Sequence, residues 1–218
     1  MLEVDLVSKH LPDGRLLMRD IRFTLRPAEV VVITGPSGCG KSTLLGIVAG
    51  LDADFEGHVA WHGAPRLGMV FQAPRLLPWR TALDNVALAA GGGAEGRARA
   101  ARALERVGLA DAADVFPSRL SVGMARRVAL ARALVIEPEA LLLDESFVSL
   151  DPKTAAKMRT IVLDEVVRRG LAVLMVSHDL KEAEQMGQTI LVLGGTPTHL
   201  LAVETGPQAE RLSGDAPR

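Results

Sequence analysis

The chain has 218 residues, of which 48% are hydrophobic and 23% charged, and its formal net charge is −1. This length fits one domain or a compact pair, and the balance excludes a disordered chain. A net charge near zero gives no electrostatic basis for binding nucleic acid, so we expect no nucleic-acid partner. The single cysteine, Cys39, excludes an internal disulfide and fits a reducing compartment.

Strands are predicted wherever short apolar and β-branched stretches occur. Residues 2–7 and 21–25 predict a pair of strands on either side of a turn near Gly14. Residues 29–34 form the kind of run that is buried on both faces of a parallel sheet. Further strands are predicted at residues 59–62, 67–71, 140–143, 172–176 and 189–193.

Helices are predicted between these strands. The Ala- and Arg-rich stretch 82–109 predicts two helices, because three consecutive glycines interrupt it. The other helices are predicted at residues 43–51, 122–136, 152–169 and 180–185, whereas the polar end, 204–218, is expected to fray. The alternation predicts an α/β sheet protein with helices on both faces, an N-terminal antiparallel part and an inserted helical subdomain at about residues 73–136.

Residues 35–42 carry the pattern Gly-x-x-x-x-Gly-Lys-Ser between a predicted strand and a predicted helix. Glycines let backbone N–H groups point at phosphate oxygens, and the helix adds its positive N-terminal end. We expect Lys41 to reach the β- and γ-phosphates and Ser42 to coordinate Mg²⁺. The expected nucleotide-binding residues are Gly35, Pro36, Ser37, Gly38, Cys39, Gly40, Lys41, Ser42 and Thr43. This motif alone leaves kinases, GTPases and ATPases open.

Two acids, Asp144 and Glu145, directly follow the apolar strand predicted at 140–143. Adjacent carboxylates are often only surface charge, but the apolar run and the phosphate loop favour a catalytic interpretation. Asp144 is placed to hold Mg²⁺ through its water shell. Glu145 is placed to polarise a water molecule for attack on the γ-phosphate.

With four further segments, the chain resembles the ATP-binding subunits of ABC transporters, a P-loop NTPase family, over nearly its full length. The matching segments are, in chain order, Walker A (35–42), the Q-loop glutamine (Gln72), the place of the signature Leu-Ser-Gly-Gly-Gln (120–124), Walker B (141–145), the D-loop (149–151) and the switch histidine (His178). Residues 71–79 and 83–86 are similar to the nitrate, sulfonate and taurine importer branch. That narrower similarity favours import over export.

The resemblance implies an ATP-hydrolysing domain over residues 1–205, followed by a flexible tail at 206–218, and a head-to-tail homodimer using ATP and Mg²⁺. The implied roles are catalysis for Glu145, His178 and Gln72, Mg²⁺ binding for Ser42, Gln72 and Asp144, and nucleotide binding across the dimer for Ser121, Gly123 and Asp151.

The implied partners are an integral-membrane permease, docked near Gln72 and Trp79, and an extracytoplasmic solute-binding protein. The implied location is cytoplasmic, on the inner face of the cell membrane. One alternative is an ABC-type ATPase that acts as an assembly or regulatory scaffold without transport. A second is a P-loop small-molecule kinase, which the D-loop and the switch histidine disfavour.

The sequence departs from the family pattern at three places. Val122 and Met124 replace a Gly and the Gln of the signature, so we expect slow hydrolysis and weak dimer closure. Ser146 stands where Pro usually follows Walker B. The chain contains no tyrosine, and the position that stacks on adenine falls near His10 or Leu11.

A group of arginines belongs to none of these motifs. It comprises Arg97, Arg99, Arg102 and Arg106 on one predicted helix. Because no aromatic residues are interleaved, we interpret this surface as a solvated helix face rather than a nucleic-acid site.

Overall fold

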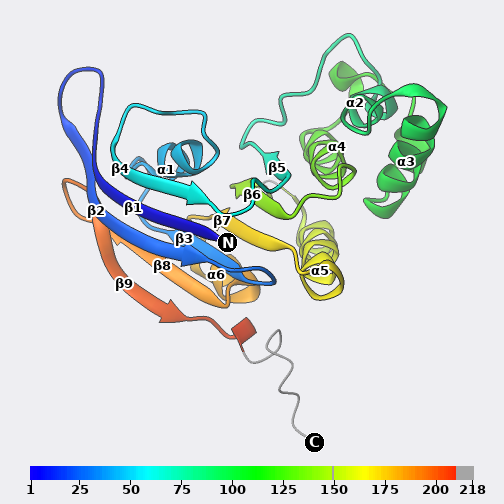
Figure 1. The fold of residues 1–218 in the computed structure, drawn as a ribbon. Coiled ribbons are helices and arrows are strands. Elements are labelled where there is room, and N and C mark those ends of the chain that lie inside the picture. The colour runs from blue at the N-terminus through cyan, green and yellow to red at the C-terminus, as the bar shows by residue number, and fades with distance from the viewer. Residues whose placement is uncertain (149, 210–218) are drawn as a thin grey trace, which may run out of the picture.

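The computed structural model describes residues 1–148 and 150–209, arranged as two sheets and a group of helices that projects from one side (Figure 1). The first sheet is antiparallel and has the strand order β2-β1-β4. Its strands are β1 (Leu2–His10), β2 (Leu16–Leu25) and β4 (Glu56–Trp61). In β1, Leu2, Val4 and Leu6 are buried and alternate with more exposed residues, so this sheet turns one face to the interior.

The second sheet has six strands in the order β5-β6-β7-β3-β8-β9. Its strands are β3 (Val30–Thr34), β5 (Leu67–Val70), β6 (Ala140–Asp144), β7 (Ala172–Val176), β8 (Thr189–Gly194) and β9 (His199–Thr205). All neighbours pair in parallel except β8 and β9. Every residue of β3, β6 and β7 is buried, because helices or the first sheet cover both faces.

Alternation along the central strands divides the interior into two apolar layers. Val31 and Ile33 pack with α1 (Lys41–Val48) and the first sheet, so α1 lies between the two sheets. Val30 and Val32 face the opposite layer, where they pack with residues of α5 (Pro152–Arg169) and α6 (Leu180–Met186). The predicted α/β fold with helices on both faces is confirmed.

The helical insert lies between β5 and β6 in the chain (Figure 1). It contains α2 (Ala82–Ala89), α3 (Gly93–Arg106) and α4 (Val122–Leu134), with 3₁₀ turns at Ala110–Ala112 and Pro117–Arg119. Side-chain caps fix where two of these helices begin: Thr81 accepts from the Asp84 N–H at 3.1 Å, and Ser121 accepts from the Met124 N–H at 3.2 Å.

The C-terminal part differs from the sequence prediction. Strand β9 was not predicted, and the expected fraying is wrong at Glu204 and Thr205, which pair with β8. Gly206 donates to the Gln188 carbonyl at 2.8 Å, and the buried Gln208 side chain donates to the Gln185 carbonyl at 2.9 Å. The first residues of the predicted flexible tail are therefore hydrogen-bonded to the core, whereas residues 210–218 lie outside the described part.

Within the described ranges, 1–148 and 150–209, we find no helix with the length and apolar character required to cross a bilayer.

Candidate nucleotide site

The phosphate loop joins the end of β3 to the start of α1. Gly40 adopts a left-handed conformation with φ of 96°, and a Cβ there would lie 2.6 Å from the Met18 methyl carbon. Gly40 also supplies no side-chain cap to α1. The N–H groups of the first helical turn therefore remain available for an anion.

Lys41, the first residue of α1, is held inside this loop. Its side chain is buried, and its Nζ donates to the carbonyls of Gly35 at 2.8 Å and Pro36 at 2.9 Å. These two bonds place the ammonium group beside the loop N–H groups. The loop thus presents one positive charge together with backbone donors, which is the chemistry that binds polyphosphate.

Ser42 connects the phosphate loop to the end of β6, since its Oγ donates to Asp144 Oδ1 at 2.9 Å. Burial raises the pKa of the Asp144 carboxyl, the Ser42 hydrogen bond lowers it, and the nearby Glu145 charge raises it again. A hydroxyl and a carboxylate are hard oxygen donors of the kind that Mg²⁺ prefers. The pair therefore fits the predicted Mg²⁺ site.

Glu145 lies beside the predicted Q-loop glutamine and switch histidine. Gln72 Nε2 donates to Glu145 Oε2 at 2.9 Å, and His178 Nδ1 lies 3.1 Å from Glu145 Oε1. The three residues follow the neighbouring parallel strands β5, β6 and β7, whose carboxyl ends share one edge of the sheet. Three residues that are distant in sequence thus meet at one carboxylate.

The backbone of Glu145 takes an unusual conformation, with φ of 45°. Its N–H still donates to the Val176 carbonyl at 3.0 Å, which continues the pairing of β6 with β7. A non-glycine residue at positive φ is strained, and such strain persists only where the surrounding structure holds it and is concentrated at functional sites. Here the backbone bond to Val176 and the side-chain contacts with Gln72 and His178 surround the strained residue.

These residues surround one pocket of about 480 Å³. It is lined by Leu11, Leu17, Ser37, Gly38, Gly40, Lys41, Ser42, Thr43, Gln72, Glu145 and His178. Of the two candidates for adenine contact, Leu11 lines the pocket and His10 does not. Leu17 was missed by the sequence analysis, because only the pairing of β1 with β2 brings it to the loop.

The signature residues lie elsewhere on the chain. Ser121 and Gly123 line a separate opening of about 320 Å³, together with Asp151 at the start of α5. Hydrogen bonds from Thr154 lower the pKa of the Asp151 carboxyl. Among the described residues, none lines both this opening and the nucleotide pocket. A single copy of the chain therefore does not join the two groups of predicted nucleotide-binding residues, and the predicted D-loop residue Ser149 lies outside the described part.

The two signature departures differ in exposure. Val122 is 61% exposed. Met124 is half-buried: it packs against the apolar layer beneath α4 and also lines the signature opening together with Val122. Ser146, which follows Walker B, is buried, and its Oγ donates to the Val70 carbonyl at 3.4 Å.

The loop that follows Gln72 is held by two side chains that the sequence analysis did not assign. The buried Asn85 side chain accepts from the Leu77 N–H at 2.8 Å and donates to three carbonyls of residues 77–81. Arg132, near the end of α4, donates to the carbonyls of Pro74 and Arg75 at 2.9 and 2.8 Å. An asparagine on the apolar face of a helix was the available signal for the first of these.

Lys41 and Glu145 therefore reach the same pocket from the carboxyl ends of two parallel strands, β3 and β6, an arrangement that defines a nucleoside triphosphatase of the P-loop class. Residues 18–148 match the family model described as ABC transporter. The chain belongs to this family, as its motifs indicated, and is an ABC-type ATPase coupled to transport. The kinase alternative is thereby excluded.

Curated relatives and solved structures agree with this assignment. The chain is 45% identical over 197 residues to the aliphatic sulfonates import ATP-binding protein SsuB 2 of Burkholderia lata, covering 88% of this chain and 72% of the relative. It is 42% identical over 215 residues to SsuB 1 of Xanthomonas axonopodis pv. citri, covering 94% and 83%. The dimeric post-hydrolysis structure of the ATP-binding cassette MJ0796 bound to ADP and Pi superimposes with a TM-score of 0.88 at 31% identity, covering 94% of this chain and 98% of that one.

Proposed function

We propose that the chain hydrolyses ATP to drive the import of organic sulfonates through a membrane permease. The observation that carries the catalytic part is the contact of Gln72 and His178 with Glu145, in a pocket that also contains Lys41 and Ser42. The substrate class is supported by the two relatives described above, both of which are aliphatic sulfonates import ATP-binding proteins.

Within one chain, Lys41 and the loop N–H groups would hold the phosphates of ATP. Ser42, Asp144 and Gln72 would hold Mg²⁺, which neutralises phosphate charge when bound. Leu11 and Leu17 would provide apolar contact for the base in place of an aromatic stack.

Glu145 would accept the proton of the attacking water, with His178 beside it. In the present structure both carboxylate oxygens of Glu145 are engaged, one by Gln72 and one by His178. Each carboxylate oxygen keeps a further acceptor site, so Glu145 could accept a proton from water while these contacts hold its orientation. Because Gln72 is also expected at the metal, movement of its side chain toward Mg²⁺ would couple nucleotide binding to the position of the base.

The complete site would form between two copies, with Ser121, Gly123 and Asp151 of one facing the phosphate loop of the other. Two observations support this: no residue in the described part of the chain lines both openings, and the MJ0796 cassette is dimeric in the structure described above. Symmetry then produces two equivalent sites from one sequence.

The permease would dock beside the loop after Gln72, on the cytoplasmic face of the membrane. Trp79 in this loop is 70% exposed, and Leu88 of α2 is 55% exposed. Arg132 connects the loop to α4, whose first turn follows Ser121 of the signature. A shift of α4 during dimer closure would therefore move the docking loop. An extracytoplasmic solute-binding protein would complete the system.

The variant Glu145→Gln tests the catalytic assignment. It should keep ATP affinity, lose turnover and accumulate as an ATP-bound dimer of twice the monomer mass in size-exclusion chromatography. The exposed substitution Glu184→Gln is a charge-matched control and should hydrolyse ATP at the wild-type rate. Undiminished hydrolysis by Glu145→Gln would remove this residue from the catalytic role.

Reconstitution with the permease and solute-binding protein in vesicles tests the transport part. Ethanesulfonate should stimulate ATP hydrolysis, whereas nitrate should not. Hydrolysis that never responds to permease or solute would favour the scaffold alternative.

A further inference from the structure

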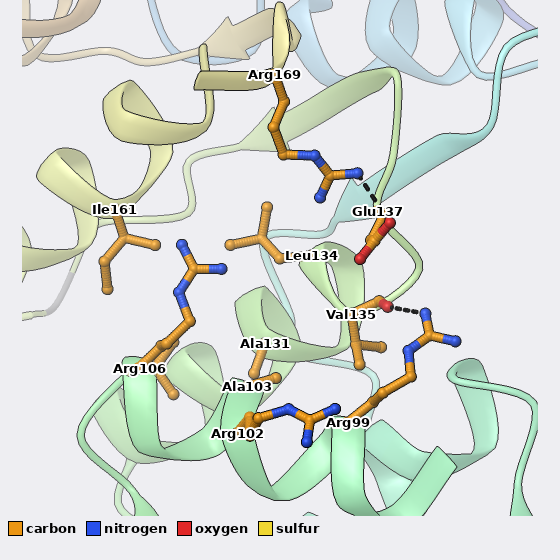
Figure 2. A pocket seen from close by; sticks show the side chains of 11 residues that line it. Arg99, Arg102, Ala103, Arg106, Ala131, Leu134, Val135, Glu137, Ile161 and Arg169 are labelled. Carbon is orange, nitrogen blue, oxygen red and sulfur yellow. Dashed lines mark hydrogen bonds and ion pairs between the residues drawn. The ribbon is translucent and has the colours of Figure 1, made fainter. Parts of the chain in front are cut away.

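A second pocket, of about 230 Å³, lies between α3, the C-terminal end of α4 and α5 (Figure 2). None of its lining residues lines the nucleotide pocket. Its apolar lining consists of Ala103, Val107, Ala131, Leu134, Val135 and Ile161. These side chains belong to both the helical insert and α5, so the pocket lies at the junction of the insert with the core.

Arginine side chains line the pocket around these apolar residues. Arg99, Arg102 and Arg106 occupy one face of α3, because positions three and four apart coincide on a helix. Arg169, at the end of α5, reaches in from the opposite side (Figure 2). This face is solvent-exposed at Arg102 and Arg106, as the sequence analysis predicted, and it also forms one wall of the pocket. Arg97 does not line it and instead pairs with Asp84.

The pocket carries more positive than negative charge. The buried Glu165 pairs with Arg106 and with Arg169, and Glu137 pairs with Arg169 at 3.1 Å. Four arginines thus share two carboxylates, which leaves an excess of two positive charges. Like charges this close on a helix repel one another. A bound anion would relieve this repulsion.

Two of the arginines have no carboxylate partner. Arg99 donates to the neutral Val135 carbonyl at 2.6 Å (Figure 2). For Arg102, no hydrogen bond or ion pair occurs with any residue in the described part of the chain. Guanidinium groups are forks that match the oxygens of carboxylates and sulfonates. Guanidinium N–H donors beside an apolar lining favour a ligand with a charged head and an apolar tail.

We propose that this pocket binds a small amphipathic organic anion, with a sulfonate or carboxylate head on Arg99 and Arg102 and a short alkyl tail over Leu134 and its apolar neighbours. At about 230 Å³ the pocket is half the size of the nucleotide pocket, so it suits a smaller ligand than ATP. The head group can come from an imported sulfonate or from a carboxylate of the cell's own metabolism.

A ligand here would touch both α3 of the insert and α5 of the core, and so resist their relative movement. Regulation of transport by this route rests on the proposed function, but binding does not. The two can fail separately, because binding is measured on the isolated chain without ATP or permease.

Calorimetry with the full chain tests the ligand chemistry. Sodium hexanesulfonate and sodium hexanoate share the tail, 1-hexanol lacks the charge, and sodium sulfate lacks the tail. We expect hexanol and sulfate to bind at least tenfold more weakly than the better of the two amphipathic anions. Tighter binding of hexanesulfonate assigns the site to sulfonates, and tighter binding of hexanoate assigns it to carboxylates. Sulfate binding as tightly as either anion would overturn the proposal.

Two variants test the location. Arg102→Gln should weaken the better anion about tenfold, because a charged hydrogen bond is lost. Arg168→Gln removes the same charge from the exposed neighbour of Arg169, which does not line the pocket, and should bind as wild type. Ala103→Leu keeps every arginine but fills the cavity, and should also weaken binding. Wild-type affinity in both Arg102→Gln and Ala103→Leu would overturn the proposed site.

Discussion

The phosphate-loop half of the ATP site and the signature half are built in different ways. Lys41 and Asp144 are buried and hydrogen-bonded to their own chain, with side chains on adjoining strand ends and helix starts. Val122 is 61% exposed at the start of α4 and lines the separate signature opening. ATP affinity should therefore be a property of one chain, and changes at the signature surface should act on dimer closure. Four variants test whether ATP affinity and dimer closure depend on different residues.

The largest effect is expected from Lys41→Ala. The substitution removes the only charged side chain of the loop and its two bonds to the Gly35 and Pro36 carbonyls. ATP affinity of the isolated chain should fall at least about a hundredfold, or about 3 kcal/mol. Calorimetry with ATP and Mg²⁺ measures this directly. Equal affinity in mutant and wild type would show that Lys41 does not contact the phosphates.

Asp144→Asn should separate stability from function. Burial raises the pKa of Asp144, so the folded state holds its proton more tightly than the unfolded state does. Its stabilising contribution is present below the unfolded pKa of about 3.9 and is lost as pH rises through the raised folded value. At neutral pH the asparagine variant should thus be more stable, by roughly 2–4 °C in Tm for about 1 kcal/mol.

The same variant should lose Mg²⁺-dependent hydrolysis at least about tenfold, since a carboxylate ligand is removed. Thermal melts between pH 4 and 8 supply the check, and the Tm difference should shrink toward the acid end. A variant less stable than wild type at neutral pH would contradict the expected direction of the stability change.

The regions of the molecule also differ in how much of their structure could be predicted from the sequence alone. The phosphate loop and Asp144-Glu145 are contiguous motifs, each next to an apolar strand, so local pattern was sufficient to place them. The side chains of Asn85 and Arg132 hydrogen-bond to the loop that follows Gln72. Arg132 is distant from this loop in sequence, so only the packing of the insert reveals its contact. Strand β9 was missed because it depends on pairing with β8.

The arginines of α3 are a further case in which local sequence pattern was not sufficient to predict a tertiary contact. Helical spacing places Arg99, Arg102 and Arg106 on one face, which the structure shows exposed at Arg102 and Arg106, but only the packing of α5 nearby makes that face the wall of a pocket. Met124 is a similar case, since the family pattern suggested a residue at the dimer surface, and the structure places it both in the signature opening and against an apolar layer. In both cases the additional contact depends on tertiary packing, which no local pattern encodes.

Met124→Gln tests that placement. A glutamine loses apolar contact with this layer, although its amide can still reach the signature opening, so unfolding free energy should fall by about 1 kcal/mol, or roughly 2–4 °C in Tm. ATP affinity of the isolated chain should not change. Met124→Leu conserves volume and serves as the matched control, with a smaller loss. Unchanged stability together with faster hydrolysis would indicate instead that Met124 acts at the dimer surface.

The smallest effect is expected from Val122, the exposed signature departure. Its branched side chain stands at the surface where the proposed second copy would bring its ATP, so trimming it should allow closer approach. Glycine at this first helical position also costs some helix stability, so Val122→Ala is the cleaner variant, because alanine has the higher helix propensity. Basal hydrolysis of Val122→Ala should rise about threefold, which corresponds to about 0.6 kcal/mol of easier closure. ATP affinity of the monomeric chain should stay at its wild-type value, because within residues 1–148 and 150–209 no residue lines both the signature opening and the nucleotide pocket. A change in that affinity would mean that the two halves communicate within one chain, and a slower rate would mean that the valine itself makes a productive contact across the dimer.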